Sequence, residues 1–305
     1  MIIDGKVLST KILEKLKADI KDGIKSGKKA PKLVVVSVGH SHESAQFIAN
    51  KEKSAKYIGA DFKHVHYKRS PKFEEFIRTI SNIGHDPEVT AMIVQKPLPA
   101  NLASETLVNY IPPQKEIEGF SKKSPHVPPL GLAVLTVLKY VYTPSDRDMV
   151  ENIVVDLKKD SQLIKSLIKR KKIVLLGRGE TGGAPIGKTL SDLKINYINL
   201  NSQTPQPDSF MQEADIIISA VGKKTITGIS LKQGCILMSI GLHLDKDKWV
   251  GDYNEKEIDP IAGFYTPTPG GIGPLNVAYL MYNLLEAWKF KSSQIAHRHS
   301  LSIET

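Results

Sequence analysis

The stretch Lys172-Ile-Val-Leu-Leu-Gly-Arg-Gly-Glu-Thr-Gly182 decides the fold. Its first five residues have the apolar, β-branched character of a buried parallel strand, and they lead directly into a G-x-G-x-x-G loop. Glycines at this spacing permit a tight turn and let the backbone approach a pyrophosphate, which binds at the amino end of the following helix. The stretch therefore predicts the strand, phosphate-binding loop and helix that open a Rossmann-type domain.

The residues after the next expected strand indicate which dinucleotide is bound. Proteins that bind NAD usually place Asp or Glu about 20 residues beyond the glycine motif, where the acid holds the ribose hydroxyls. Here that region reads Asn199-Leu-Asn-Ser-Gln-Thr204 and contains no acid. Arg178 and Ser202 are suited to a 2′-phosphate instead, so the sequence favours NADP over NAD.

Strand and helix patterns alternate on both sides of this loop. Before it, residues 33–38 and 90–94 are expected to be buried strands and 65–67 a further strand. Residues 43–58, 73–83 and 132–141 are expected to be helices, and so are 7–24, with Ser9 or Thr10 as the cap. After the loop, strands are expected at 197–200, 216–220 and 236–240. This alternation over 305 residues predicts an α/β protein of two domains.

The composition and the apolar runs of the chain further limit the class of protein. The single cysteine, Cys235, excludes an intrachain disulfide, no Cys/His cluster has zinc-site spacing, and we expect no bound metal. No apolar run approaches the ~18 residues of a spanning helix, and the first residues do not resemble a secretory signal, so we expect a cytoplasmic protein without membrane contact. The net charge of +10 includes seven Lys/Arg against three Asp/Glu in residues 151–172. We expect this segment to form a surface helix; binding of RNA or another polyanion is the less favoured interpretation.

Several residues elsewhere suggest a second site. Phe47 and Lys51 are four residues apart on one expected helix and share a face. Gln95 follows a buried strand, which is where open α/β sheets place ligands. Glu118 lies in a short loop motif, and residues 269–274 form a glycine-rich segment that opens the last helix.

In this order, these segments resemble the bifunctional methylenetetrahydrofolate dehydrogenase/methenyltetrahydrofolate cyclohydrolase family over almost the whole chain. The family's motifs Y-V-x-x-K, V-Q-L-P-L-P, K-D-V-D-G-F, V-G-R-S-x-x-V-G-x-P, A-D-I-V-I-x-A-V-G-K and T-P-V-P-G-G-V-G-P-M-T are similar to residues 47–51, 94–99, 115–120, 176–185, 214–223 and 266–276.

The resemblance implies an amino-terminal α/β catalytic domain, residues 1–141 with 275–305, and a Rossmann NADP-binding domain, residues 142–274, with the active-site cleft between them. It implies NADP-dependent oxidation of 5,10-methylenetetrahydrofolate to the methenyl compound, followed by hydrolysis to 10-formyltetrahydrofolate. This chemistry belongs to one-carbon metabolism and supplies purine biosynthesis. The family resemblance also implies a homodimer.

The resemblance assigns roles residue by residue. Lys51 is the acid/base group of the hydrolysis, Gln95 orients it, and Glu118 accepts hydrogen bonds from the pterin, which makes these three the catalytic candidates. The substrate-binding candidates are Phe47, Lys51, Val94, Gln95, Lys96, Glu118, Pro269, Gly270, Gly271, Ile272 and Gly273. The cofactor-binding candidates are Gly177, Arg178, Gly179, Gly182, Ser202 and Leu242.

The chain departs from the family pattern at functional positions. Phe47 stands where the family has Tyr, Glu118 where it has Asp, and Lys96 where it has an apolar residue. Further along the chain, Gly179 replaces Ser, Asn201 replaces His, Ser239 replaces Asp and Asn276 replaces Thr. The loop after Phe120 is also shorter than in the family. Two alternatives therefore stay open: a member with only one of the two activities, and another two-domain NADP-dependent dehydrogenase that uses Lys51 on a carboxylate substrate.

Overall fold

The computed structural model describes residues 1–104, 106–144, 153–246 and 248–303. The chain divides into two compact units. The first, called the five-stranded unit, comprises Met1–Ile12 and Pro128–Asn276. The second, called the three-stranded unit, comprises Leu13–Val127 and Val277–Thr305. Helices α1 (Gly5–Lys25) and α10 (Ile272–Ile303) have residues in both units.

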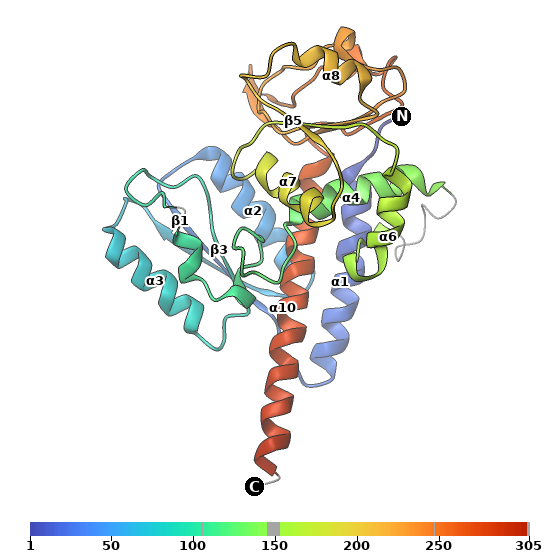
Figure 1. Cartoon of the computed structure of the whole chain (residues 1–305). Coiled ribbons are helices and arrows are strands. Elements are labelled where there is room, and N and C mark those ends of the chain that lie inside the picture. The colour runs from blue at the N-terminus through green and yellow to red at the C-terminus, as the bar shows by residue number, and fades with distance from the viewer. Residues whose placement is uncertain (105, 145–152, 247, 304–305) are drawn as a thin grey trace. The chain divides into compact units, whose positions relative to one another are not determined.

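The three-stranded unit is built on a parallel sheet of strand order β2-β1-β3. Its strands are β1 (Lys32–Val38), β2 (Asp61–Tyr67) and β3 (Ala91–Val94), with α2 (His42–Tyr57), α3 (Phe73–His85), η1 (Leu107–Tyr110) and η2 (Pro113–Lys115) between and after them. Helices α2 and α3 lie on opposite faces of this sheet (Figure 1). Val34 and Val36 of β1 pack with Phe76 and Ile80 of α3 in one apolar core.

The central position of β1 in this sheet matters for ligand binding. The chain moves from β1 to one neighbour, β2, and then across to the other, β3. The loops that follow β1 and β3 therefore diverge from adjacent strands at the carboxyl edge, which is where open α/β sheets bind ligands. Gln95, directly after β3, donates its backbone N–H to Val36 at 2.8 Å and so lies at this edge.

The five-stranded unit contains a second parallel sheet of order β10-β7-β6-β4-β5. Its strands are β4 (Ile173–Leu176), β5 (Ile198–Leu200), β6 (Ile216–Ser219), β7 (Ile236–Ser239) and β10 (Phe264–Tyr265). Its other elements are α4 (Pro129–Tyr142), α6 (Leu157–Ile168), α7 (Gly183–Asp192), α8 (Pro207–Glu213), η4 (Gly228–Ser230), α9 (Glu255–Ile258) and an antiparallel hairpin of β8 (His243–Asp245) and β9 (Lys248–Val250). This is a doubly wound order whose switch point falls between β4 and β6.

The amino terminus belongs to the five-stranded unit because it pairs with the sheet edge. Ile3 donates its backbone N–H to Tyr265 at 2.8 Å, and Tyr265 donates back to Met1 at 3.0 Å. The expected cap of the first helix is wrong. The Asp4 carboxylate accepts from the N–H groups of the first turn, at 2.8 Å from Lys6, and the helix begins at Gly5. Asp is as good a cap as Ser, and it precedes the turn instead of lying within it.

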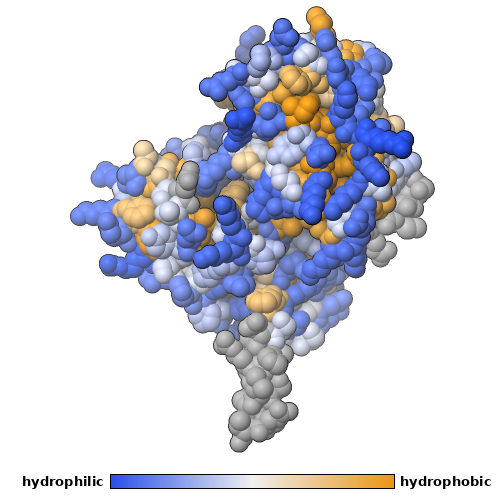
Figure 2. Space-filling view, in the orientation of Figure 1, coloured by the Kyte–Doolittle hydropathy of each residue, from blue (hydrophilic) through white to orange (hydrophobic). Residues whose placement is uncertain are grey.

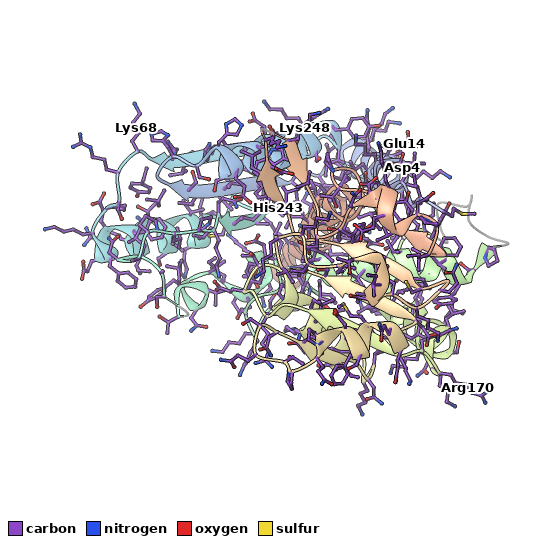
Figure 3. All side chains as sticks on the ribbon, turned by 90° about the horizontal axis from the view of Figure 1, so that it is seen from above. Asp4, Glu14, Lys68, Arg170, His243 and Lys248 are labelled. Carbon is purple, nitrogen blue, oxygen red and sulfur yellow. The ribbon has the colours of Figure 1, made fainter. Side chains whose placement is uncertain are left out.

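The lysine-rich segment forms helix α6 in residues 157–168, while residues 151 and 152 lie outside the described residues. Ile164 and Ile168 are buried, and Asp160 accepts a hydrogen bond from Lys139 of α4 at 2.9 Å. Arg170, just after α6, projects from the surface of its unit (Figure 3). The segment is therefore a half-buried helix anchored to α4 with its charges on the outside, as predicted.

The structural units divide the chain differently from the predicted domains, because α4 groups with the five-stranded unit. The division at residues 141/142 and 274/275 stays a prediction. Within the described residues, no helix is both long enough and apolar enough to cross a bilayer.

Candidate functional site

Lys51 is the centre of the candidate site in the three-stranded unit. It lies on α2, whose first turn is capped by the Ser41 hydroxyl, and its side chain is only 11% exposed. The Nζ atom donates to Oε1 of Gln95 at 2.8 Å and lies 3.8 Å from Oε1 of Glu118. The structure thus brings together the three residues that sequence reasoning named as catalytic.

The surroundings of Lys51 favour its neutral form. Burial lowers the pKa of the amine from its ordinary value, and the Glu118 carboxylate opposes that shift. Desolvation penalises an ammonium, whereas a nearby carboxylate stabilises it. The balance leaves an amine that is able both to accept and to return a proton closer to neutral pH than an exposed lysine does.

Gln95 is held in one orientation. Its Nε2 donates to the carbonyl of Lys96 at 2.7 Å, so its Oε1 is the atom that faces Lys51. An amide in this position can only accept from Lys51 and carries no charge. Gln95 therefore fixes the amine in space without raising the proton affinity as strongly as a carboxylate would.

Glu118 is positioned by a neighbour that sequence reasoning missed. The buried Glu116 carboxylate accepts from the backbone N–H of Glu118 at 2.9 Å and from that of Ser121 at 3.1 Å. These bonds shape the turn at Gly119, which has φ +71°. The sequence does show a second acid two residues before Glu118, but nothing in this spacing indicates that its carboxylate accepts from the backbone of the turn.

The other predicted folate contacts of this unit are close in sequence to Lys51 or Gln95. Phe47 lies one helical turn before Lys51 and is 37% exposed, so its side chain is partly accessible to solvent. Val94 is the last residue of β3 and is buried. The ammonium of Lys96 lies 5.0 Å from the centre of the Phe120 ring.

The glycine loop of the five-stranded unit has the geometry that its sequence predicts. Gly177 has φ +101°, and a Cβ atom there would lie 2.6 Å from the carbonyl oxygen of Ala220, so a side chain is excluded. Gly182 precedes α7, which begins without a side-chain cap. An uncapped helix start after a tight glycine turn fits a pyrophosphate. Gly179 has open space around it.

Arg178 and Ser202 follow adjacent strands, β4 and β5, and both are exposed. Nε of Arg178 donates to Oδ1 of Asn199 at 2.9 Å. Ser202 lies in a turn in which Asn201 donates its backbone N–H to the Thr204 hydroxyl at 3.0 Å. A cationic fork and a hydroxyl at the same sheet edge are the donors that a 2′-phosphate needs, so the residues present fit NADP.

A buried acid that sequence reasoning missed shapes the loop after β6. Asp252 is fully buried and accepts from the Ser219 hydroxyl at 2.6 Å and from the backbone N–H groups of Gly222 at 2.9 Å and Lys223 at 3.1 Å. Leu242, a predicted cofactor contact, has its carbonyl oxygen 3.6 Å from where a Cβ atom on Gly222 would lie. Asp252 is some 30 residues from this loop in sequence, so no spacing pattern reveals the contact.

Residues 269–271 form a tight turn that leads into α10, and Ile272 and Gly273 are the first residues of that helix. Gly270 has φ +117°, and a Cβ atom on Gly5 would lie 1.8 Å from the Gly271 carbonyl oxygen. The start of α1 therefore packs directly on the backbone of this loop. This turn belongs to the five-stranded unit, whereas the Lys51 cluster belongs to the three-stranded unit.

A dinucleotide-type loop at a switch point and a buried lysine that contacts an amide and a carboxylate are typical of a nucleotide-dependent α/β enzyme. Residues 3–118 match the catalytic domain of tetrahydrofolate dehydrogenase/cyclohydrolase, and residues 154–292 match the NAD(P)-binding domain of the same proteins. The chain belongs to the tetrahydrofolate dehydrogenase/cyclohydrolase family.

Individual relatives agree with this assignment. The bifunctional protein FolD of Staphylococcus aureus is 28% identical over 296 residues, which cover 95% of this chain and 97% of the relative. The structure of the bifunctional enzyme FolD from Campylobacter jejuni superposes with a TM-score of 0.82 at 25% identity, covering 95% of this chain and 98% of the other. A 5,10-methylenetetrahydrofolate dehydrogenase from the silkworm Bombyx mori gives a TM-score of 0.77 at 25% identity, covering 96% and 99%.

These matches confirm the predicted family, the α/β fold class with its two kinds of domain, and an enzyme of dehydrogenase and cyclohydrolase type. The NAD(P)-binding domain confirms the predicted class of cofactor.

Proposed function

We propose that this protein oxidises 5,10-methylenetetrahydrofolate with NADP and hydrolyses the methenyl product to 10-formyltetrahydrofolate, with Lys51, Gln95 and Glu118 at the reacting carbon. The observation that carries this proposal is the buried Lys51 amine, held 2.8 Å from Gln95 and 3.8 Å from Glu118. Burial lowers the pKa of this amine and the bond to Gln95 fixes its position, and both favour its use as a general base in the hydrolysis of a cationic carbon.

The first reaction depends on positioning. NADP, when bound, accepts a hydride from the methylene carbon. The chain's contribution is to hold the folate against the cofactor: Phe47 offers a stacking face, Glu118 accepts from the pterin, and residues 269–273 pack against the ring. Neither Lys51 nor Gln95 needs to move a proton in this step, because the substrate loses only a hydride.

The second reaction uses the amine. Water attacks the methenyl carbon while the neutral Lys51 Nζ accepts a proton from it, and a C–O bond forms. The resulting ammonium then returns a proton to the pterin-ring nitrogen as the bond from this nitrogen to the carbon breaks. The hydroxyl proton of the adduct is released to water as the C=O bond forms, which leaves the formyl group on the other nitrogen. Gln95 keeps Nζ on one side of the carbon throughout, and Glu118 stabilises the ammonium between the two transfers.

NADP is the proposed cofactor because positive charge and neutral polar groups surround the expected position of the 2′-phosphate. Gly177, Gly179 and Gly182 would form the pyrophosphate loop, Arg178 and Ser202 would hold the 2′-phosphate, and Leu242 would be a further contact to NADP. A carboxylate at the end of β5 would favour NAD, and the residues from 199 to 204 include none.

We further propose a cytoplasmic homodimer that supplies one-carbon units for purine biosynthesis, with folate as its ligand and no nucleic-acid partner. Apolar side chains gather on one face of the unit that carries β5 and α8 (Figure 2). The exposed apolar residues of this unit include Ile198, Phe210 and Ile229. A surface of this kind suits pairing with a second copy. Light scattering after gel filtration tests this: a mass of one chain would contradict it.

The experiment for the main proposal is a pair of assays on purified protein. NADP reduction by methylenetetrahydrofolate and loss of the methenyl chromophore are each followed against a heat-inactivated control. Both activities are expected. Absence of both would overturn the proposal, and loss of hydrolysis alone would identify a dehydrogenase in which Phe47, Lys96 or Glu118 has changed the second step.

A further inference from the structure

An uncharged amide links the glycine loop to the neighbouring strand. Asn199 lies on β5 and pairs in register with Leu175 of β4. Its Oδ1 accepts from Nε of Arg178 at 2.9 Å, and its Nδ2 donates to the carbonyl of Gly177 at 3.1 Å. Because one partner is a donor and the other an acceptor, only this orientation of the amide satisfies both.

The two bonds act on consecutive residues. The N–H of Gly177 already donates to Leu200 at 2.9 Å, so both polar groups of this glycine are tied to β5. The backbone that carries Arg178 is thereby fixed, and its side chain is fixed again at Nε. The planar guanidinium then has one direction left for its two terminal NH₂ groups, which form the edge that binds phosphate in two parallel hydrogen bonds.

The neutrality of Asn199 is as important as its geometry. Across the described residues, Arg178 makes no ion pair with a carboxylate, and its Nε donates to the neutral side chain of Asn199. A carboxylate at residue 199 would hold Nε equally well, but it would cancel the positive charge and repel a phosphate dianion. The amide orients the arginine and leaves its whole charge for the ligand.

We propose that Asn199 is the positioning residue that sets the preference for NADP, by aiming the Arg178 guanidinium at the 2′-phosphate. This inference rests on the proposed use of NADP and adds the residue that determines it. Asn199 does not touch the reacting atoms and acts through Arg178. The competing explanation is that Asn199 only holds the glycine loop in place through its hydrogen bond to Gly177. Loss of that bond would weaken the binding of NAD and NADP alike, because both contain the pyrophosphate.

The test compares N199A and N199D in the full-length enzyme, with the exposed Asn196 changed to Ala as the matched control. For N199A, the KM for NADP is expected to rise about tenfold with little change in kcat, as for one lost oriented interaction. The kinetic constants with NAD are expected to stay within about twofold. N199D is expected to lose more NADP affinity than N199A, because it keeps an acceptor for Nε but neutralises the charge. Equal losses with both cofactors, or no loss in either variant, would overturn the inference.

A binding measurement separates this inference from the proposed function. Calorimetry with 2′,5′-ADP and with 5′-AMP probes the 2′-phosphate without any folate or turnover. If the wild type does not prefer 2′,5′-ADP, the proposed cofactor itself is wrong. If the wild type prefers it and N199A retains the full preference, only the role of Asn199 is wrong.

A double-mutant cycle with R178A tests whether the two residues act as one. If Asn199 works through Arg178, adding N199A to R178A is expected to weaken 2′,5′-ADP binding by less than twofold, although N199A alone weakens it about tenfold. A full tenfold effect in the R178A background would mean that Asn199 acts on the loop and not through the arginine. Melting temperatures of all variants accompany the cycle, so that a folding defect is recognised.

Discussion

Replacing Glu118 by Gln changes the electrostatics of Lys51 while keeping the shape of the side chain. The two charged atoms are 3.8 Å apart, and the side chains are 11% and 21% exposed. At this distance, Coulomb's law gives about 1 kcal/mol at the dielectric constant of water and about 4 kcal/mol at an effective value of ~20. Because both groups are mostly buried, the interaction is expected to lie above the lower figure.

The sign of the effect follows from which form of Lys51 the carboxylate stabilises. Glu118 stabilises the ammonium and so raises the pKa of Lys51 against the lowering by burial. In E118Q only the lowering by burial remains, so the neutral amine persists to lower pH. An interaction of about 1 kcal/mol or more changes the ratio of neutral to charged amine at least about fivefold at any given pH.

The assay is the pH dependence of kcat for hydrolysis of the methenyl compound at saturating substrate. The part of the pH profile in which activity rises as Lys51 loses its proton is expected to move to lower pH in E118Q. The control is E88Q: Glu88 lies before the start of β3, whereas Gln95 of the site follows its end, so this variant is expected to leave the profile in place. An unmoved profile with a raised KM would mean that Glu118 only binds substrate. A profile moved to higher pH would refute the electrostatic reasoning.

Three further changes test the framework around both sites. G177A is expected to weaken NADP binding at least tenfold, because the new Cβ meets a carbonyl oxygen at 2.6 Å with φ at +101°. G234A, at a positive φ of +80° but with open space and outside the glycine loop, is the control that should bind normally, and calorimetry measures both. D252A is expected to destabilise the protein by about 2–4 kcal/mol in urea unfolding, since it leaves a buried hydroxyl and backbone N–H groups without their acceptor, and an unchanged midpoint would contradict this. K139A is expected to cost about 3 kcal/mol in the same assay, because the Asp160 side chain, 14% exposed, loses its lysine and keeps, among the described residues, only the backbone N–H of Asp156, and a loss below about 1 kcal/mol would mean that water replaces the lysine.

Local pattern was sufficient to predict most elements of the fold. The run from Lys172 to Gly182 indicated a strand, a tight turn and a helix start, and the structure has β4, a positive φ at Gly177 and α7 there. A strand, a tight turn and a helix start depend mainly on residues that are neighbours in the chain, so they can be predicted from a short stretch of sequence. The cap of α1 was misplaced because Asp4 lies before the apolar repeat that marks the helix.

Contacts between distant residues were not predictable in the same way. Lys51 and Gln95 were named separately, but their 2.8 Å hydrogen bond joins a residue of α2 to one that directly follows β3, 44 positions further along the chain. Glu116 and Asp252 serve as acceptors for backbone N–H groups, and nothing in residue type separates them from the other acids of the chain. The sequence thus identifies the groups that carry chemistry better than the groups that hold them in place.

The central claim is that Lys51 is the acid/base group of hydrolysis and not a general binding residue. The most direct measurement compares both activities in K51A, with the exposed Lys53 on the same helix changed to Ala as the control. Hydrolysis is expected to fall at least a thousandfold, within the range for loss of a general acid/base group, while hydride transfer to NADP survives in part and K53A keeps both. Equal loss of the two activities in K51A, or hydrolysis that persists, would contradict this account.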